Sequence, residues 1–182
     1  HEIRRIVDGY LDRVVDRGEC DLVADVTGPF PMDVNSALLG IPEDDRPTLR
    51  AHADQILVRE DGKMAIPRAA AEGFFALLTY FVEDLRRRKA GIGSGLVTDL
   101  LDLEVDGRSL TDEELLGFCV LFVIAGHETT TKMVANAIEL LSRHPDQRAA
   151  LVADPSLIAG AVEEVLRFHP STQYMHRTLT RD

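Results

Sequence analysis

The stretch that decides the fold is TDEELLGFCVLFVIAGHETTT, residues 111–131. It opens with a capping box, in which Thr111 at the N-cap and Glu114 three residues later each accept a hydrogen bond from the other's backbone N–H. The helical pattern then continues to Arg143, because the residue before Pro145 avoids helical geometry. A helix from Thr111 to Arg143 would be roughly 50 Å long at 1.5 Å per residue. The sequence therefore predicts one very long helix against which the other elements pack.

This predicted helix breaks several local rules at one place. Residues 118–124 are apolar on every face, which indicates burial all round. They run directly into Gly126, and a helix-interior glycine costs roughly 0.5–1 kcal/mol relative to alanine. The threonines at 129–131 are weak helix formers, and Glu128 beside a buried segment needs a partner or water. Such violations tend to mark functional sites.

The spacing of these residues indicates a chemistry. Ala125 and Thr129 lie four residues apart on one face, and the Thr129 hydroxyl can bond the Ala125 carbonyl and bend the helix. With Gly126 alongside, that face has no bulk, so a flat ligand could lie against it while Glu128 and Thr129 form a proton path. A threonine-rich kink in a purely structural helix is the alternative. A zinc site of the H-E-x-x-H type is excluded, because residue 131 is threonine.

The rest of the chain also has a helical pattern, so a mainly α fold with little sheet is expected, as one partial domain over residues 1–182. Thr27–Pro31 and Asp106–Gly107 are predicted turns, and the chain after Pro170 is predicted to be extended. The basic run Arg86–Lys89 is interpreted as a solvated helix end. Apolar periodicity, caps and proline stops predict helices over Ile3–Arg17, Arg46–Arg59, Pro67–Arg88, Thr111–Arg143 and Ser156–Phe168, with shorter ones over about Met32–Leu39, Leu96–Leu103 and Pro145–Ala153.

Composition excludes several classes of function. The 182 residues carry a formal net charge of −11, which argues against nucleic-acid binding because phosphate contacts need a basic face. The longest apolar stretch is too short to span a bilayer, which takes about 20 residues. Cys20 and Cys119 form no C-x-x-C pair, so neither a disulfide framework nor a cysteine zinc site is expected, and a reducing, cytoplasmic setting is indicated. No metal-ligand cluster is expected.

Two motifs, in their order, resemble the cytochrome P450 family. Residues 125–130, AGHETT, match the Ala/Gly-Gly-x-Asp/Glu-Thr-Thr/Ser pattern of the family's long distal helix, and Glu164–Arg167 matches its E-x-x-R. By itself an i,i+3 Glu–Arg pair is common on helix surfaces. The segments Leu22–Asp25, Leu38–Pro42 and His176–Thr178 add to the likeness, which points to the soluble bacterial branch. The resemblance implies the central helices of that fold, approximately helices D to K.

The resemblance also implies roles for individual residues. Thr129 would hydrogen-bond oxygen bound at the haem iron, and Glu128 would relay protons. Glu164 and Arg167 would be a buried structural pair rather than catalysts. Ala125, Gly126 and Thr130 would contact the haem, and Arg177 would contact it through a propionate. Gln173 and Tyr174 would border the substrate pocket.

The resemblance implies a haem-thiolate monooxygenase, which inserts one oxygen atom of O2 into a C–H bond of a small hydrophobic substrate. Its electron donor would be a ferredoxin or flavodoxin, and no nucleic-acid or membrane partner is expected. The family's cysteine loop lies downstream of E-x-x-R, and neither Cys20 nor Cys119 has its context. The chain by itself is therefore expected to lack thiolate-ligated haem and activity. A haem-free, P450-like helical partner or activator protein is the alternative, and an unrelated ligand-binding helical bundle is a third.

Overall fold

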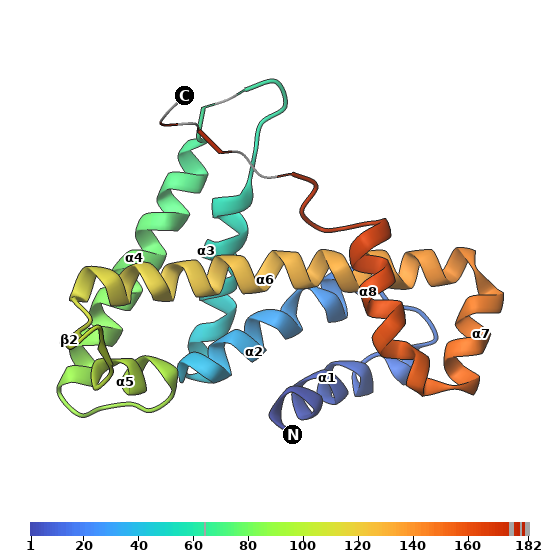
Figure 1. The fold of residues 1–182 in the computed structure, drawn as a ribbon, viewed down its shortest axis with the longest axis horizontal. Coiled ribbons are helices and arrows are strands. Elements are labelled where there is room, and N and C mark those ends of the chain that lie inside the picture. The colour runs from blue at the N-terminus through green and yellow to red at the C-terminus, as the bar shows by residue number, and fades with distance from the viewer. Residues whose placement is uncertain (64, 175–176, 179, 181–182) are drawn as a thin grey trace. The chain divides into compact units, whose positions relative to one another are not determined.

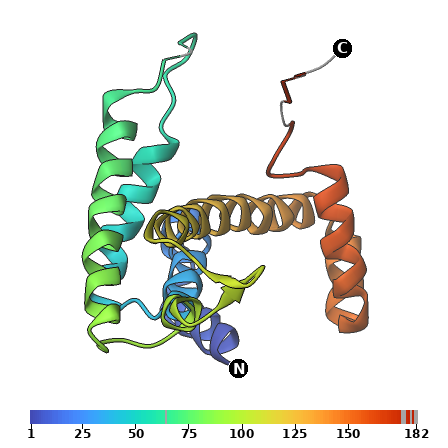
Figure 2. The ribbon, with the colours of Figure 1, turned by 60° about the vertical axis from the view of Figure 1, so that its left-hand side comes forward.

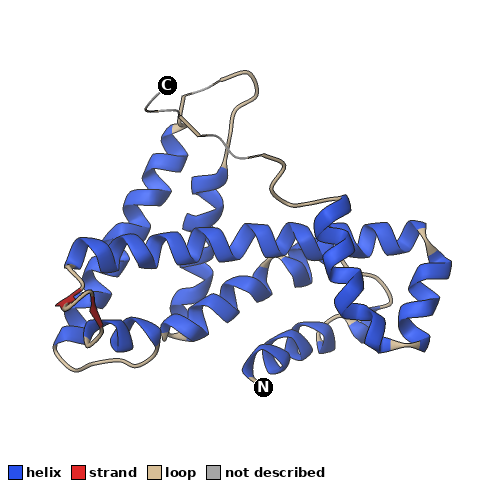
Figure 3. Cartoon of the chain, viewed as in Figure 1, coloured by secondary structure: helices blue, strands red, loops and turns tan. Residues whose placement is uncertain are grey.

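The computed structural model describes all residues except 64, 175–176, 179 and 181–182. It is almost entirely helical, with two short strands (Figures 1 and 3). Its contacts divide the chain into two compact units, His1–His127 and Glu128–Asp182. The helices are α1 (Glu2–Asp12), α2 (Pro29–Leu39), α3 (Arg46–Leu57), α4 (Arg68–Lys89), α5 (Leu96–Leu101), α6 (Asp112–Arg143), α7 (Pro145–Ala153) and α8 (Ile158–Phe168), and the strands are β1 (Glu104–Val105) and β2 (Arg108–Ser109).

The first unit is built around the antiparallel pair α3 and α4, which lie side by side in both views (Figures 1 and 2). Their facing stripes meet α2 and the first half of α6 in one core, and a smaller cluster joins α1 to α2. Burial of these apolar side chains is the main stabilising contribution, roughly 25 cal/mol per Å² removed from water. The central core consists of Met32, Leu39, Ile41, Leu49, Ala53, Leu77, Phe81, Leu85, Val97, Leu115, Cys119, Val120 and Val123.

The long helix is confirmed, and so is the capping box that begins it. The Thr111 backbone N–H donates to Glu114 Oε2 at 2.8 Å, and the Glu114 N–H donates to Thr111 Oγ1 at 3.3 Å. Arg108 adds a bidentate contact to the same Glu114 carboxylate, at 2.6 and 2.7 Å. The N-terminus of α6 is therefore satisfied by side chains within a few residues of it.

The turn predicted at Thr27–Pro31 is wrong. Residues Val23–Thr27 form a π-helical turn, and α2 begins at Pro29. The first backbone N–H groups of a helix have no intrahelical partner, so prolines at Pro29 and Pro31 remove no bond there. The turn at Asp106–Gly107 is confirmed: both residues have positive φ, +54° and +78°, and they join β1 to β2 as an antiparallel hairpin.

The basic run at the end of α4 is solvated only in part. Arg86 is exposed, whereas the Arg88 side chain is 1% exposed and donates to Asp84 Oδ2 at 2.6 Å. Arg88 also donates to the backbone oxygens of Ser94 at 2.7 Å and Gly40 at 3.1 Å. The interpretation of Arg88 as a solvated residue is wrong, because Asp84 one turn earlier makes its burial affordable.

The second unit contains the end of α6 together with α7 and α8, and neither α7 nor α8 has a buried residue. Its apolar side chains line an open groove of about 900 Å³ that includes Met133, Leu140, Leu151 and Val165. The described residues after Pro170 form no strand, although this segment was expected to be extended. Within the described part of the chain, no helix is both long enough and apolar enough to cross a lipid bilayer.

Candidate functional site

The α6 motif presents two different faces. Leu121 is 65% exposed, and Ala125 and Thr129, which follow it at intervals of four residues, are also exposed. On the other face Val123 is fully buried and His127 is 4% exposed. One stripe of α6 therefore carries an aliphatic side chain, a methyl group and a hydroxyl in sequence, all accessible, as the sequence analysis expected for Ala125 and Thr129.

Gly126 lies on the packed side of the helix. A Cβ atom placed on it would come within 2.5 Å of the Asn35 side-chain nitrogen in α2, so any larger residue would require the Asn35 side chain to move. Asn35 itself is buried. The missing side chain of Gly126 is thus accounted for by the close approach of α2 to α6. Its predicted place in a haem groove stays a prediction.

His127, for which the sequence suggested no role, connects α6 to α3. Its Nε2 donates a hydrogen bond to Asp54 Oδ1 at 2.9 Å, and the imidazole is 5% exposed while Asp54 is 60% exposed. The two residues are 73 positions apart, so no local pattern could have indicated their pairing. This contact fixes the register of α6 against α3 one residue before Glu128.

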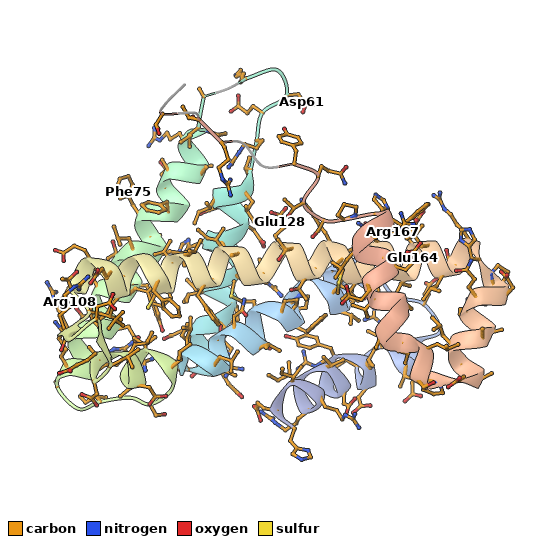
Figure 4. All side chains as sticks on the ribbon, in the orientation of Figure 1. Asp61, Phe75, Arg108, Glu128, Glu164 and Arg167 are labelled. Carbon is orange, nitrogen blue, oxygen red and sulfur yellow. The ribbon has the colours of Figure 1, made fainter. Side chains whose placement is uncertain are left out.

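Glu128 is half-buried, with 31% of its side chain exposed, and its Oε1 lies 2.5 Å from Lys132 Nζ. The sequence analysis missed Lys132, although a glutamate four residues before a lysine is a recognisable helical pair. The lysine holds the carboxylate along the helix, toward the turn that follows. Figure 4 shows Glu128 projecting from the middle of α6. Thr130 is half-buried on the adjoining side.

The Glu164–Arg167 pair forms as predicted but is not buried. Arg167 donates to both carboxylate oxygens of Glu164 at 2.7 Å (Figure 4). The side chain of Glu164 is 59% exposed and that of Arg167 is 69% exposed. The hydrogen bonds from Arg167 lower the pKa of Glu164, and the same contact raises the pKa of Arg167. Within residues 1–182 no described segment covers this face of α8, and the burial that the resemblance implies for this pair stays a prediction.

The residues expected to border the haem edge and substrate lie after α8 in a segment without regular structure. Gln173 is exposed and donates to the Pro170 carbonyl at 2.8 Å, Tyr174 is 74% exposed, and Arg177 is exposed. His176 lies outside the described residues. The roles predicted for Gln173, Tyr174 and Arg177 stay predictions.

The two cysteines have contrasting environments. Cys20 is exposed, and Cys119 is buried within α6. Burial, with a further contribution from the Asp84 charge, raises the pKa of Cys119 to about 12. Among the described residues, no group of three or more histidine, cysteine or acidic side chains could hold a metal ion.

Comparison with known proteins gives sequence relatives over the whole chain. The chain is 42% identical to "Putative cytochrome P450 123" of Mycobacterium tuberculosis over its entire length, which is 44% of that protein. It is 36% identical to the "Steroid C26-monooxygenase" of Mycolicibacterium smegmatis, over 99% of this chain and 45% of that one. The chain thus spans somewhat less than half the length of the curated relatives it matches. No family model matches it.

Solved structures agree with these relatives. Ligand-free cytochrome P450 TbtJ1 superposes with a TM-score of 0.82 at 35% identity, over 91% of this chain and 44% of that one. The CYP109E1–testosterone complex from Bacillus megaterium gives 0.81 at 29% identity, over 92% and 45%. The fold is a mainly α assembly organised by a long helix with an internal glycine–acid–threonine motif. The chain belongs to the cytochrome P450 family, and the relatives it matches are bacterial.

Proposed function

We propose that the protein carrying this chain is a cytoplasmic haem-thiolate monooxygenase, which inserts one oxygen atom of O2 into a C–H bond of a small hydrophobic substrate. Residues 1–182 would be the middle part of its catalytic domain. The observation that carries the proposal is the accessible stripe Leu121, Ala125 and Thr129 on α6, with the Glu128 carboxylate beside it. A helix that served only as a scaffold would need no carboxylate and hydroxyl at the margin of an apolar face.

The α6 stripe fits the distal face of a haem. Leu121 offers an apolar surface, and Ala125 leaves room for a flat ring because only a methyl group projects there. When bound and held by a cysteine thiolate, haem supplies scission of the O–O bond. Thr129 then has the task of holding a hydrogen bond above the ring. Glu128, the neighbouring residue, carries protons from solvent toward Thr129, a task that its partly exposed carboxylate supports.

The cysteines of this chain do not fit the thiolate ligand. Cys119 has a pKa of about 12 and lies in the buried core, where the anionic form is disfavoured. It is also about ten residues before Thr129 on the same helix, roughly 15 Å along the axis, and so cannot reach the opposite face of a haem that Thr129 covers. Cys20 is exposed and follows the 3-10 turn Val15–Arg17, away from α6 in the chain. For residues 1–182 alone we therefore expect no thiolate-ligated haem.

The remaining residues have supporting tasks in the same proposal. Arg177 would pair with a haem propionate as a charge-assisted contact, Thr130 would border the distal surface, and Gln173 and Tyr174 would border the substrate. Gly126 would act from behind that surface, by letting α6 pack against Asn35 of α2. Glu164 and Arg167 would act as a structural pair. The bidentate geometry of that pair supports this task.

The relatives indicate an apolar organic substrate without narrowing it. One is named for a steroid and another is a cyclomarin C epoxidase from Salinispora arenicola. In this chain Val58 and Ile66, in the connection between α3 and α4, are 45% and 75% exposed, which supports an apolar substrate near that connection. We propose a ferredoxin or flavodoxin as electron donor.

The test is to replace Thr129 in the haem-loaded, full-length protein. Thr129→Ala should leave haem content and substrate binding unchanged, but lower the product formed per NADH consumed by about 100-fold, the lower end of the range for a lost proton-transfer group. The electrons should appear as released hydrogen peroxide. Thr129→Ser should restore coupling, and Thr131→Ala, two residues along the same helix, should couple normally. Unchanged coupling in Thr129→Ala would remove Thr129 from the mechanism.

A further inference from the structure

A cavity in the first unit carries a charge opposite to that of the chain as a whole. It has a volume of about 590 Å³ and lies between α1, α2 and the start of α3. The chain has a formal net charge of −11, yet arginines outnumber carboxylates around this cavity. The charged residues that line it are Arg5, Arg13, Arg17, Arg46 and Arg50, against Asp25, Asp33 and Glu43.

The carboxylates of the cavity offset only part of its positive charge. Asp33 accepts a hydrogen bond from the Tyr10 hydroxyl at 2.7 Å. Asp25 lies 3.3 Å from Arg17 and also accepts from the Asp21 backbone N–H at 3.1 Å. Glu43 is 77% exposed and points largely to solvent. Arg5 is in turn paired with Glu2, whose Oε1 lies 2.5 Å from its Nη2. The positive charge that is not held in a close ion pair among the described residues therefore belongs to Arg13, Arg46 and Arg50.

Arg46 is the most constrained of these arginines. Its side chain is only 13% exposed, and its nearest carboxylate, Glu43, is 3.9 Å away. Its hydrogen bonds to the Ile41 carbonyl are long, at 3.4 and 3.5 Å. A guanidinium that has lost most of its water usually gains close, charged hydrogen bonds in exchange. Arg46 has lost most of its hydrating water and has no close, charged hydrogen bond in its place among the described residues.

Two further arginines join Arg46 at the same cavity. Arg50 follows it by one helical turn on α3 and forms no ion pair among the residues the structure describes. Arg13, directly after α1, lies over the Tyr10 ring at 4.6 Å from its centroid, which orients the side chain without neutralising it. Guanidinium groups from two helices thus surround one volume, and each offers the planar fork that matches a carboxylate or phosphate.

The wall of the cavity contains an unexplained glycine. Gly9 lies inside α1 between Arg5 and Arg13, and it lines the cavity. A Cβ atom built on it would meet nothing within 4 Å, so no neighbouring atom requires the glycine. Glycine in a helix interior is destabilising relative to alanine. Its effect here is to keep the space between these two arginines open.

We propose that this cavity binds a small organic anion with two or more phosphate or carboxylate groups, held by Arg46 and Arg50 of α3 and by Arg13 directly after α1. This site is separate from the α6 motif and does not depend on the proposed monooxygenase activity. A small molecule fits better than an acidic protein surface, because Arg46 is recessed. A ligand here would join α1 to α3, which the described contacts connect mainly through α2.

The test is calorimetric titration of the full-length protein with inorganic pyrophosphate and, separately, with citrate. We expect one molecule of at least one of these anions to bind per chain, more weakly as salt is raised. Arg50→Gln and Arg46→Gln should each raise the Kd tenfold or more, while Arg86→Gln, an exposed arginine on α4, should leave it unchanged. Arg50→Gln matters most, because Arg46 also contacts the backbone and its variant could be less stable.

The glycine supplies an independent test. Gly9→Ala should retain binding and Gly9→Leu should abolish it, with circular dichroism confirming that both variants keep the helical content of the wild type. Pyrophosphate identifies a phosphate site and citrate a carboxylate site. Absence of binding by both anions would overturn the proposal. So would binding that Arg50→Gln and Gly9→Leu leave unchanged, since that would show association with the general surface, and so would binding of an acidic protein alone.

Discussion

Glu114 and Cys119, five residues apart near the start of α6, have opposite environments. Glu114 is exposed and receives hydrogen bonds from Arg108 and from the Thr111 backbone, which lower its pKa to about 2. Cys119 is buried, and burial raises its pKa to about 12. The capping box at Glu114 was predictable because its partners are adjacent in sequence. The Arg108 contact was not, because it depends on the hairpin that β1 and β2 form.

The first prediction at this scale concerns pH. The carboxylate of Glu114 stabilises the folded chain at pH values above its ordinary pKa near 4.3, and this contribution is lost as the pH falls through about 2. Carbon-detected NMR titration of Glu114 should give a midpoint near 2. In Arg108→Gln the midpoint should move up toward the ordinary range. A midpoint near 4.3 in the wild type would show that the Arg108 contact is not maintained in solution.

The second prediction concerns thiol reactivity. A thiol with a pKa near 12 is about one part in ten thousand thiolate at pH 8, so Cys119 should not react with a disulfide reagent in the native protein. In a Cys20→Ser background the native form should show almost no labelling, and urea should expose one reactive thiol. Rapid labelling of native Cys20→Ser would show that Cys119 is accessible, and would reopen its exclusion as a metal ligand.

Helices were the most predictable elements. The spacing of apolar residues, the cap at Thr111 and the stop at His144–Pro145 are local signals, and α3, α4, α6 and α8 begin or end within a few residues of the predicted bounds. The contacts between helices were not predictable. Asn35 against Gly126 and Asp54 with His127 join residues distant in sequence, and periodicity carries no information on such pairs.

Arg88 provides the prediction at the scale of elements. Its guanidinium joins α4 to the C-terminus of α2 at Gly40 and to the loop before α5 at Ser94. Arg88→Ala removes the buried hydrogen bond to Asp84 Oδ2 and leaves that carboxylate with Arg87 alone, at 3.0 Å from Oδ1, which should lower the free energy of unfolding by about 1.5–3 kcal/mol. Arg86→Ala, exposed two residues earlier, should change it by less than about 0.5 kcal/mol. Urea denaturation measures both, and equal effects would contradict the assigned role of Arg88.

For the whole molecule, the family was predictable because two motifs occur in the right order along one chain. The environment of each motif was harder to predict. The Glu164–Arg167 pair, for which the resemblance implies burial, is exposed within residues 1–182, and α8 leaves Ile158, Val162 and Leu166 at least 40% exposed. A sequence motif identifies the partners of an ion pair. The burial of that pair depends on which other segments cover it, and the sequence of α8 alone does not determine those segments.

The most direct test of the account is the absorption spectrum of the reduced, CO-treated full-length protein in which Cys20 and Cys119 are both replaced by alanine. If α6 is the distal helix of a haem-thiolate enzyme and neither cysteine is its ligand, the variant should keep the red-shifted Soret band typical of a thiolate–CO haem. Loss of that band in a folded variant would show that one of these cysteines ligates the iron. A wild-type protein that binds no haem would contradict the monooxygenase assignment itself and would favour a haem-free helical partner.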